Sequence, residues 1–310
     1  MLIEIILIVV GIAVVLWGAD RFTDGASGLA RRLKVSELVI GLTVVALGTS
    51  LPEFIVSFMS VLRGSGDMSV GNVVGSNIFN GLVVIGCSAI LINLKVDKVL
   101  LRRDIPLTLV ASVLLLAFVA SDNSLSRVEA VVLLAFFGIY SWVTYRVAMQ
   151  DRRAAGEVKE ETTPMPKLLL LIAVGIAALV VGGRVLVDNA AAVAREFHVS
   201  ESVIGLTILA AGTSLPELVT SMVAARKGSE GLALGNALGS NIFNIAFVLG
   251  ICGSVSPLTV TDITLVDWCM LVGSTLLLWL LAWTGKKLNR GEGTVLVCAY
   301  LAYLVWLLAR

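Results

Sequence analysis

The chain has 310 residues, of which 58% are hydrophobic and only 15% are charged, and its formal net charge is +1. A water-soluble domain carries about a quarter charged residues, so this composition excludes an ordinary soluble fold and indicates a membrane-embedded protein. The near-neutral charge argues against nucleic acid as a partner. No obligatory protein partner and no cofactor are indicated.

Ten stretches of mostly apolar residues are long enough to cross a bilayer as helices, which takes about 20 residues. Helices are expected because backbone groups in lipid must be hydrogen-bonded internally and strand-like alternation is absent. The stretches cover, with edges uncertain by several residues, 2–19, 38–62, 70–93, 104–121, 127–147, 167–187, 202–225, 231–255, 266–284 and 294–309. We therefore predict an all-α polytopic membrane protein with ten transmembrane helices.

The second stretch contains a carboxylate, Glu53, directly after Pro52. A charged side chain at membrane depth costs about 2.5–3.5 kcal/mol on insertion scales, so it marks a functional site by default. A structural role near a helix end is the alternative. Proline inside a helix frees the carbonyl four residues back, here that of Gly48. A bent or broken helix with free carbonyl oxygens is expected, and a plain proline kink is the alternative.

The chain repeats itself at an offset of 164 residues. SELVIGLTVVALGTSLPE (36–53) aligns with SESVIGLTILAAGTSLPE (200–217) at fourteen of eighteen positions, and GNVVGSNIFN (71–80) aligns with GNALGSNIFN (235–244) at eight of ten. A duplication that preserved helix packing alone would not need these motifs spelled out twice. The repeat divides the chain into residues 1–149, a short cytoplasmic linker at 150–166, and residues 167–310.

Each half contains five predicted spans. Because five is odd, the second half enters the membrane from the opposite side, so the fold is predicted to be two inverted five-helix repeats. Secondary transporters often have this architecture, with the binding site near the midplane between the repeats. Eighteen of the 23 Lys and Arg residues fall on one side of this topology. By the positive-inside rule, both termini are predicted to be extracytoplasmic.

The repeat places a second acid, Glu217, after Pro216 at the same depth as the first. Thr49 and Glu53 are four residues apart, so they are expected to share one helix face. The same spacing separates Ser76 from Asn80, Thr213 from Glu217, and Ser240 from Asn244. A cage of such hard oxygen ligands suits Ca²⁺ and Na⁺ better than zinc or copper. Two carboxylates neutralise one Ca²⁺, and emptying the cage would leave two buried anions, so another cation must replace it.

The paired GTSLPE and GN-x-x-GSN-x-x-N blocks resemble the two α-repeats of the cation/calcium antiporter superfamily, and most of all the prokaryotic sodium/calcium exchangers. The resemblance covers essentially the whole chain. It implies a plasma-membrane antiporter that carries Ca²⁺ and Na⁺ as substrates through a central diamond of four ion sites. It also implies that the first and sixth spans slide across the other helices to alternate access.

Carried over by position, the resemblance implies binding residues in both halves. The calcium site falls on Glu53 and Glu217 with the main-chain oxygens of Thr49 and Thr213, and these two glutamates are the metal ligands. The sodium sites fall on Ala46, Thr49, Ser50, Ser76 and Glu53, and on Ala210, Thr213, Ser214, Ser240 and Glu217, with Asn80 and Asn244 in the middle of the diamond. Several exchangers carry an aspartate where this chain has Asn244, so the resemblance argues against potassium co-transport.

Three other functions are weighed against a Na⁺/Ca²⁺ antiporter. A Ca²⁺/H⁺ antiporter could use the same scaffold, because two glutamates could carry two protons, but the Ser and Thr ligands favour Na⁺. An ion channel is disfavoured by inverted repeats around a midplane site. An intramembrane enzyme with Ser50 or Ser240 as nucleophile lacks a His or Lys base in any span near them, so no catalytic residue is predicted.

Overall fold

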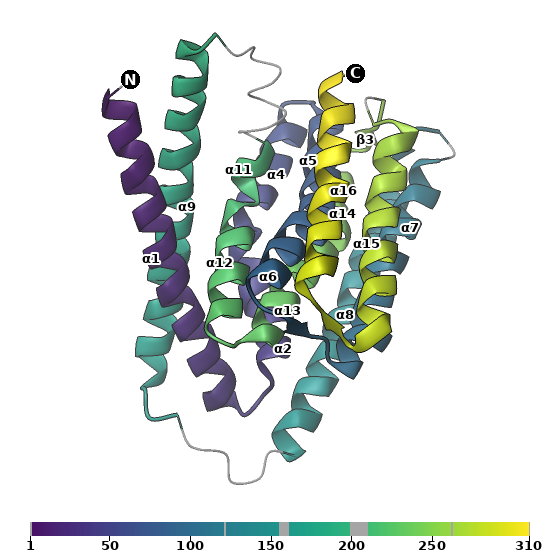
Figure 1. Ribbon diagram of the computed structural model, residues 1–310. Coiled ribbons are helices and arrows are strands. Elements are labelled where there is room, and N and C mark those ends of the chain that lie inside the picture. The colour runs from purple at the N-terminus through teal and green to yellow at the C-terminus, as the bar shows by residue number, and fades with distance from the viewer. Residues whose placement is uncertain (1, 121, 155–160, 199–209, 262, 310) are drawn as a thin grey trace.

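The computed structural model describes residues 2–120, 122–154, 161–198, 210–261 and 263–309. Helices make up nearly all of this chain (Figure 1). The first half contains α1 (Leu2–Leu33), α2 (Glu37–Ile40), α3 (Ala46–Thr49), α4 (Leu51–Leu62), α5 (Gly66–Phe79), α6 (Ile85–Leu91), α7 (Ile105–Val119) and α8 (Arg127–Ala154). The second half contains α9 (Met165–Glu196), α11 (Ala210–Thr213), α12 (Leu215–Arg226), α13 (Glu230–Ile242), α14 (Leu249–Val255), α15 (Leu265–Gly285) and α16 (Arg290–Ala309).

Short π-helical and extended segments join these helices. The π-helices are η1 (Gly41–Val45), η2 (Asn80–Val84), η3 (Leu100–Asp104) and η5 (Phe243–Val248). The two-residue strands are β1 (Leu94–Lys95), β2 (Ser124–Leu125), β3 (Leu258–Thr259) and β4 (Lys287–Leu288). β1 pairs antiparallel with β4, and β2 with β3. Each pair therefore joins a strand from before the linker to a strand from after it.

The described helices confirm an all-helical polytopic membrane fold. Seven of them are long and apolar enough to span a bilayer, and an eighth candidate is the bent pair Glu37–Thr49 and Leu51–Leu62. The expected span 104–121 corresponds to η3 and α7. The expected span 202–225 begins outside the described residues and continues as α11 and α12. The number of ten spans and the inverted relation of the halves therefore stay predictions.

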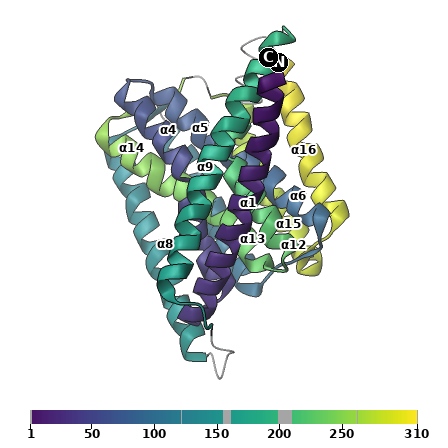
Figure 2. The ribbon, with the colours of Figure 1, turned by 90° about the vertical axis from the view of Figure 1, so that its left-hand side faces the viewer.

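The longest helices, α1 and α9, lie side by side across one face of the bundle (Figures 1 and 2). Glycines allow their close approach. A Cβ at Gly175 would lie 2.6 Å from the Cβ of Phe22, and one at Gly18 would lie 2.8 Å from the Cβ of Ala178. Small residues at such crossings let helix backbones pack closely in membranes. The two helices therefore form a tightly packed pair along the edge of the other helices.

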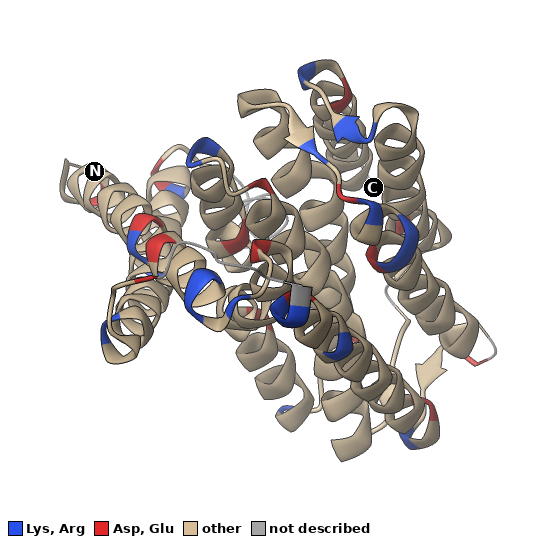
Figure 3. Ribbon diagram, turned by 90° about the horizontal axis from the view of Figure 1, so that it is seen from below, with Lys and Arg blue, Asp and Glu red and all other residues tan. Residues whose placement is uncertain are grey.

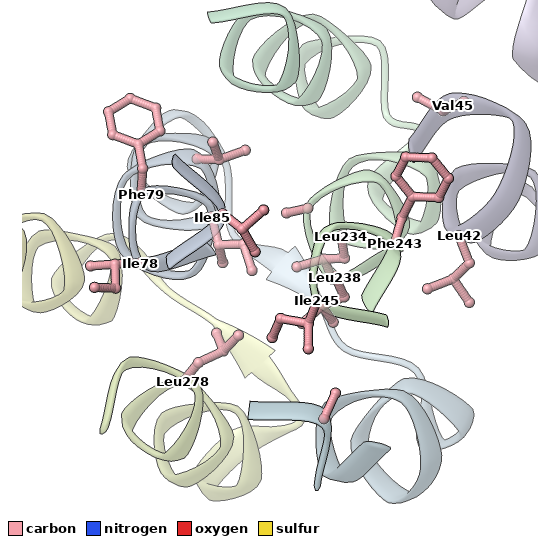
Figure 4. Packing of buried hydrophobic residues seen from close by; sticks show 14 of the residues in the cluster. Leu42, Val45, Ile78, Phe79, Ile85, Leu234, Leu238, Phe243, Ile245 and Leu278 are labelled. Atoms are coloured by element: carbon pink, nitrogen blue, oxygen red, sulfur yellow. The ribbon is translucent and has the colours of Figure 1, made fainter. Parts of the chain in front are cut away.

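The core of the remaining helices is apolar and draws on both halves. Figure 4 shows Ile78 and Ile85 from one half near Leu238 and Ile245 from the other. All four side chains are at most 1% exposed. Apolar side chains also cover the outside, as lipid-facing surfaces require. The polar residues of the repeated motifs are consequently enclosed by apolar packing.

Charged residues lie mainly at helix ends and in the connecting segments (Figure 3). After the linker, Glu161 accepts a hydrogen bond from the Arg31 guanidinium at the end of α1, with 2.8 Å between Nε and Oε2. Hydrogen bonds from Thr163 and the Arg31 guanidinium lower the pKa of the Glu161 carboxyl to about 2. The residues that follow the linker are thereby fastened to α1.

Candidate ion-binding site

Two breaks in the chain position the acids of the repeated motif. α3 ends at Thr49 and α4 begins at Leu51, with a bend of 47° between the two helical segments. Ser50 at the break has φ −86° and ψ 9°, and Ser214 between α11 and α12 has φ −89° and ψ 7°. These angles leave the α-helical region. The expected break is confirmed.

The prolines stand at the start of new helices. Pro52 and Pro216 occupy the first turns of α4 and α12, where the missing N–H costs no helical hydrogen bond. Glu53 and Glu217 follow in the same turns, where the helix dipole favours a negative charge. Thr49 and Glu53 therefore belong to two different helices. The expectation that they share one helix face is wrong, because the chain bends at the residue between them.

The two halves exchange hydrogen bonds at the acids. The Ser50 hydroxyl donates to Oε1 of Glu217 at 2.7 Å, and the Ser214 hydroxyl donates to Oε1 of Glu53 at 3.0 Å. Ser50, Ser214 and both glutamates are 0% exposed. Each acid is thus held by the serine that precedes the other acid by three residues. This crossed pair brings both repeated motifs to one point inside the protein.

Further predicted ligands gather around Glu217. The Ser240 hydroxyl lies 3.4 Å from Oε1 of Glu217 and 3.5 Å from the main-chain oxygen of Ala46. Thr49 is 1% exposed, and its hydroxyl donates to the carbonyls of Val45 and Ala46. The structure therefore brings Ala46, Thr49 and Ser240 together beside this acid.

Two asparagines that were not singled out from the sequence support the main chain of the acids. Asn236 donates to the carbonyl of Glu217 at 3.2 Å and accepts from the Thr49 hydroxyl at 2.9 Å. Asn72 donates to the carbonyl of Glu53 at 3.2 Å. Both stand at the same place in the two GN-x-x-GSN blocks. Their presence in both copies was the signal that could have identified them.

A second set of asparagines lies where α5 and α13 continue into π-helices. The Asn77 amide donates to the carbonyl of Asn241, and the Asn241 amide donates to the carbonyl of Asn77, at 3.1 and 3.3 Å. The Asn244 amide also donates to Oδ1 of Asn77 at 3.3 Å. Such π-helical turns are rare and often occur at functional sites. The structure thus joins Asn244 to the centre of the molecule through Asn77.

Several buried oxygens at the site have no hydrogen-bond partner among the described residues. They are Oε2 of Glu53, Oε2 of Glu217, Oγ of Ser76, Oδ1 of Asn80, Oγ1 of Thr213 and Oδ1 of Asn244. Buried polar atoms are nearly always hydrogen-bonded, so such a group requires an explanation. Carboxylate, hydroxyl and amide oxygens are the donor set of hard cations such as Ca²⁺. Within the described part of the chain, no group of three His, Cys, Asp or Glu side chains could hold a metal ion.

The predicted residues are not all joined equally. Ser76 and Asn80 are buried, but the structure gives neither side chain a bond to an acid. Ala210 begins α11, and its side chain lies outside the described residues. Thr213 is half-buried, whereas its counterpart Thr49 is almost fully buried. The ligand set is therefore more complete around Glu217 than around Glu53.

A polytopic helical fold that encloses two acids between broken helices defines the class of membrane transporters. The chain belongs to the sodium/calcium exchanger family, within the cation/calcium antiporter superfamily, because the family model "Sodium/calcium exchanger protein" matches residues 3–146 and 167–309. The sodium/calcium exchanger MaX1 of Methanosarcina acetivorans is 33% identical over 98% of both chains. The inner membrane protein YrbG of Escherichia coli is 35% identical over 99% of this chain and 98% of its own.

Solved structures agree with this assignment. A structure of the sodium-calcium exchanger NCX_Mj soaked with Na⁺ and Sr²⁺ matches with a TM-score of 0.85 and 32% identity, covering 98% of both chains. The family and the structural similarity support a cation/calcium antiporter. These relatives are transporters and not enzymes.

Proposed function

We propose that the protein exchanges Ca²⁺ for Na⁺ across the membrane by alternating access. The observation that carries the proposal is the crossed pair of hydrogen bonds that holds Glu53 and Glu217 together without exposure to solvent. Two buried carboxylates without a bound cation are costly, because an isolated charge in a low-dielectric site loses its solvation. One Ca²⁺ or several Na⁺ offset this cost, so one cation leaves only when another replaces it.

The ligand roles follow the geometry of the two halves. Glu53 and Glu217 bind Ca²⁺ with the main-chain oxygens of Thr49 and Thr213. Na⁺ uses the hydroxyl and carbonyl groups beside each acid: Ala46, Thr49, Ser50 and Ser76 in one half, and Ala210, Thr213, Ser214 and Ser240 in the other. Asn80 and Asn244 complete the centre. The unpartnered buried oxygens at these positions support this assignment.

The proposed architecture is ten spans in two inverted halves, residues 1–149 and 167–310, joined by a cytoplasmic linker at 150–166. The recurrence of equivalent contacts at an offset of 164 residues supports it, as in the bonds of Asn72 to Glu53 and of Asn236 to Glu217. Both termini would lie outside the cytoplasm. The name of the Escherichia coli relative, an inner membrane protein, supports a location in the inner membrane.

A Ca²⁺/H⁺ antiporter is the second candidate. Neither Glu53 nor Glu217 is paired with a Lys or Arg in the described chain, so protons could neutralise both acids. The four hydroxyl groups that surround the acids favour Na⁺, because protons need no such ligands.

Calcium flux into proteoliposomes separates the two candidates. We expect an outward Na⁺ gradient at equal pH to drive ⁴⁵Ca²⁺ uptake, and Glu53→Gln and Glu217→Gln to abolish it. Glu129→Gln, the same change at a glutamate outside the site, is the matched control and should leave uptake unchanged. Uptake driven by a pH gradient but not by Na⁺ would overturn Na⁺ coupling in favour of proton coupling.

A further inference from the structure

An ion-pair cluster fastens α1 to the turn between α12 and α13. The Lys227 ammonium lies 2.6 Å from Oδ1 of Asp20 and 2.7 Å from Oδ1 of Asp24. It also donates to the main-chain oxygen of Asp20 at 3.1 Å. None of these groups contacts the acids of the ion site. The cluster therefore connects the α1–α9 pair to the other helices at a distance from the cations.

The repeat assigns each member of this cluster a counterpart at the other end of the molecule. At the offset of 164 residues, Lys227 corresponds to Arg63 and Asp24 to Asp188. The glycines after the two basic residues, Gly64 and Gly228, have φ values of 77° and 80°, so the two turns have the same form. Arg63 follows the end of α4 and Asp188 lies in the second half of α9, at the end opposite the α12–α13 turn (Figures 1 and 2).

The counterpart cluster is not assembled. Within the described chain Arg63 makes no ion pair and is exposed. Asp188 is paired instead with Arg184 on its own helix, at 3.6 Å, with 83% and 65% of the two side chains exposed. One end of the α1–α9 pair is thus fastened while the equivalent end is free.

We propose that Lys227 with Asp20 and Asp24, and Arg63 with Asp188, are two ion-pair latches that form alternately in the two access states. In an inverted-repeat transporter, the second access state arises when the two halves exchange conformations. The contacts that α1 makes at one end would then be made by α9 at the other. This inference rests on the proposed alternating access, and it names the residues that set the balance between its two states.

The two latches are unequal, so the balance has a direction. Lys227 meets two carboxylates, but the counterpart of Asp20 is Arg184, which competes with Arg63 for Asp188. A further bond at the first end joins Ser27 to Ser229 at 3.2 Å, and the counterpart of Ser27 is an alanine. The protein without substrate therefore favours the state described above, in which the Lys227 latch is formed.

Transport kinetics measured separately at the two faces test the latches. The apparent affinity at each face falls with the fraction of molecules that are open to it. We expect Lys227→Gln to change the ratio of the two half-saturating Ca²⁺ concentrations by about two- to fivefold, as for a partly exposed ion pair. Arg63→Gln should change it in the opposite direction, and Lys227→Arg should preserve it. Shifts in the same direction, or no shift in either variant, would overturn the proposal.

A gain-of-contact variant provides a second kinetic test. Arg184→Asp gives Arg63 the two carboxylates that Lys227 already has, so it should shift the ratio in the same direction as Lys227→Gln. Arg127→Gln, at an arginine outside both latches, is the control and should leave the ratio unchanged. An Arg184→Asp shift that matches Arg63→Gln instead would contradict the second latch.

Cross-linking tests the assembly of the second latch directly. In a chain whose four cysteines are replaced by serine, a short bismaleimide should link Lys227→Cys to Asp24→Cys without substrate. It should link Arg63→Cys to Asp188→Cys mainly during turnover, and each link should stop flux. If the second pair never links while flux remains normal, the latches are wrong and the antiporter proposal stands. Loss of flux in the cysteine-free parent chain would instead count against the proposed function.

Discussion

The side chain of Asn236 joins three helical segments beside the acid pair, and its removal has a calculable cost. Its amide donates to the carbonyl of Glu217 and the hydroxyl of Ser221, and its Oδ1 accepts from Thr49. Interhelical hydrogen bonds in membranes average about 0.6 kcal/mol each. Asn236→Ala is therefore expected to lower the free energy of unfolding by about 2 kcal/mol.

The equivalent residue in the first half provides a matched control. Asn72 makes two such bonds, to the carbonyl of Glu53 and to the hydroxyl of Ser57, so Asn72→Ala should cost about 1 kcal/mol. Unfolding of both variants by SDS in mixed micelles, followed by tryptophan fluorescence, measures the difference. Asn236→Ala should also raise the half-saturating Ca²⁺ concentration more than Asn72→Ala does. Equal losses of stability, or a larger loss in Asn72→Ala, would refute this reasoning.

Three further variants test other parts of the molecule. Arg103→Gln removes the guanidinium that lies 2.8 Å from the fully buried Asp104, and should lower stability by about 3–5 kcal/mol in the same unfolding assay; a loss below about 1 kcal/mol would contradict the ion pair. Gly175→Leu places a side chain against Phe22, so it should separate α1 from α9, cost about 1–3 kcal/mol and slow exchange; normal flux would show that this close packing is dispensable. Because the pKa of Glu161 is lowered to about 2 from 4.5, its carboxylate should fasten the linker fully above about pH 4.5 and lose this effect as the pH falls toward 2. Hydrogen exchange at residues 161–167 should follow that change in the parent chain and not in Glu161→Gln.

Part of the site was predictable because the duplication preserves it. Glu53 and Glu217 stand out in an apolar sequence, since a carboxylate at membrane depth is rare without a function. The prolines that precede them predicted a break in each helix, and the structure contains it. These signals are local, so one half of the sequence suffices to read them.

The crossed bonds were not predictable in the same way. That Ser50 meets Glu217, and Ser214 meets Glu53, depends on how the two halves pack. The shared helix face expected for Thr49 and Glu53 failed because regular helical spacing does not continue through a bend. The asparagine of the GN pair was visible in both copies, but sequence cannot distinguish a residue that binds a cation from one that holds the backbone behind it.

A crystal of the protein soaked with Sr²⁺, which scatters anomalously in the place of Ca²⁺, would examine the acid pair most directly. We predict one strong anomalous peak between the carboxylates of Glu53 and Glu217, within about 2.3–2.6 Å of oxygens from both, as for a calcium site. A well-occupied peak that contacts neither carboxylate, or an electron-density map in which the two acids point apart into separate environments, would contradict the account.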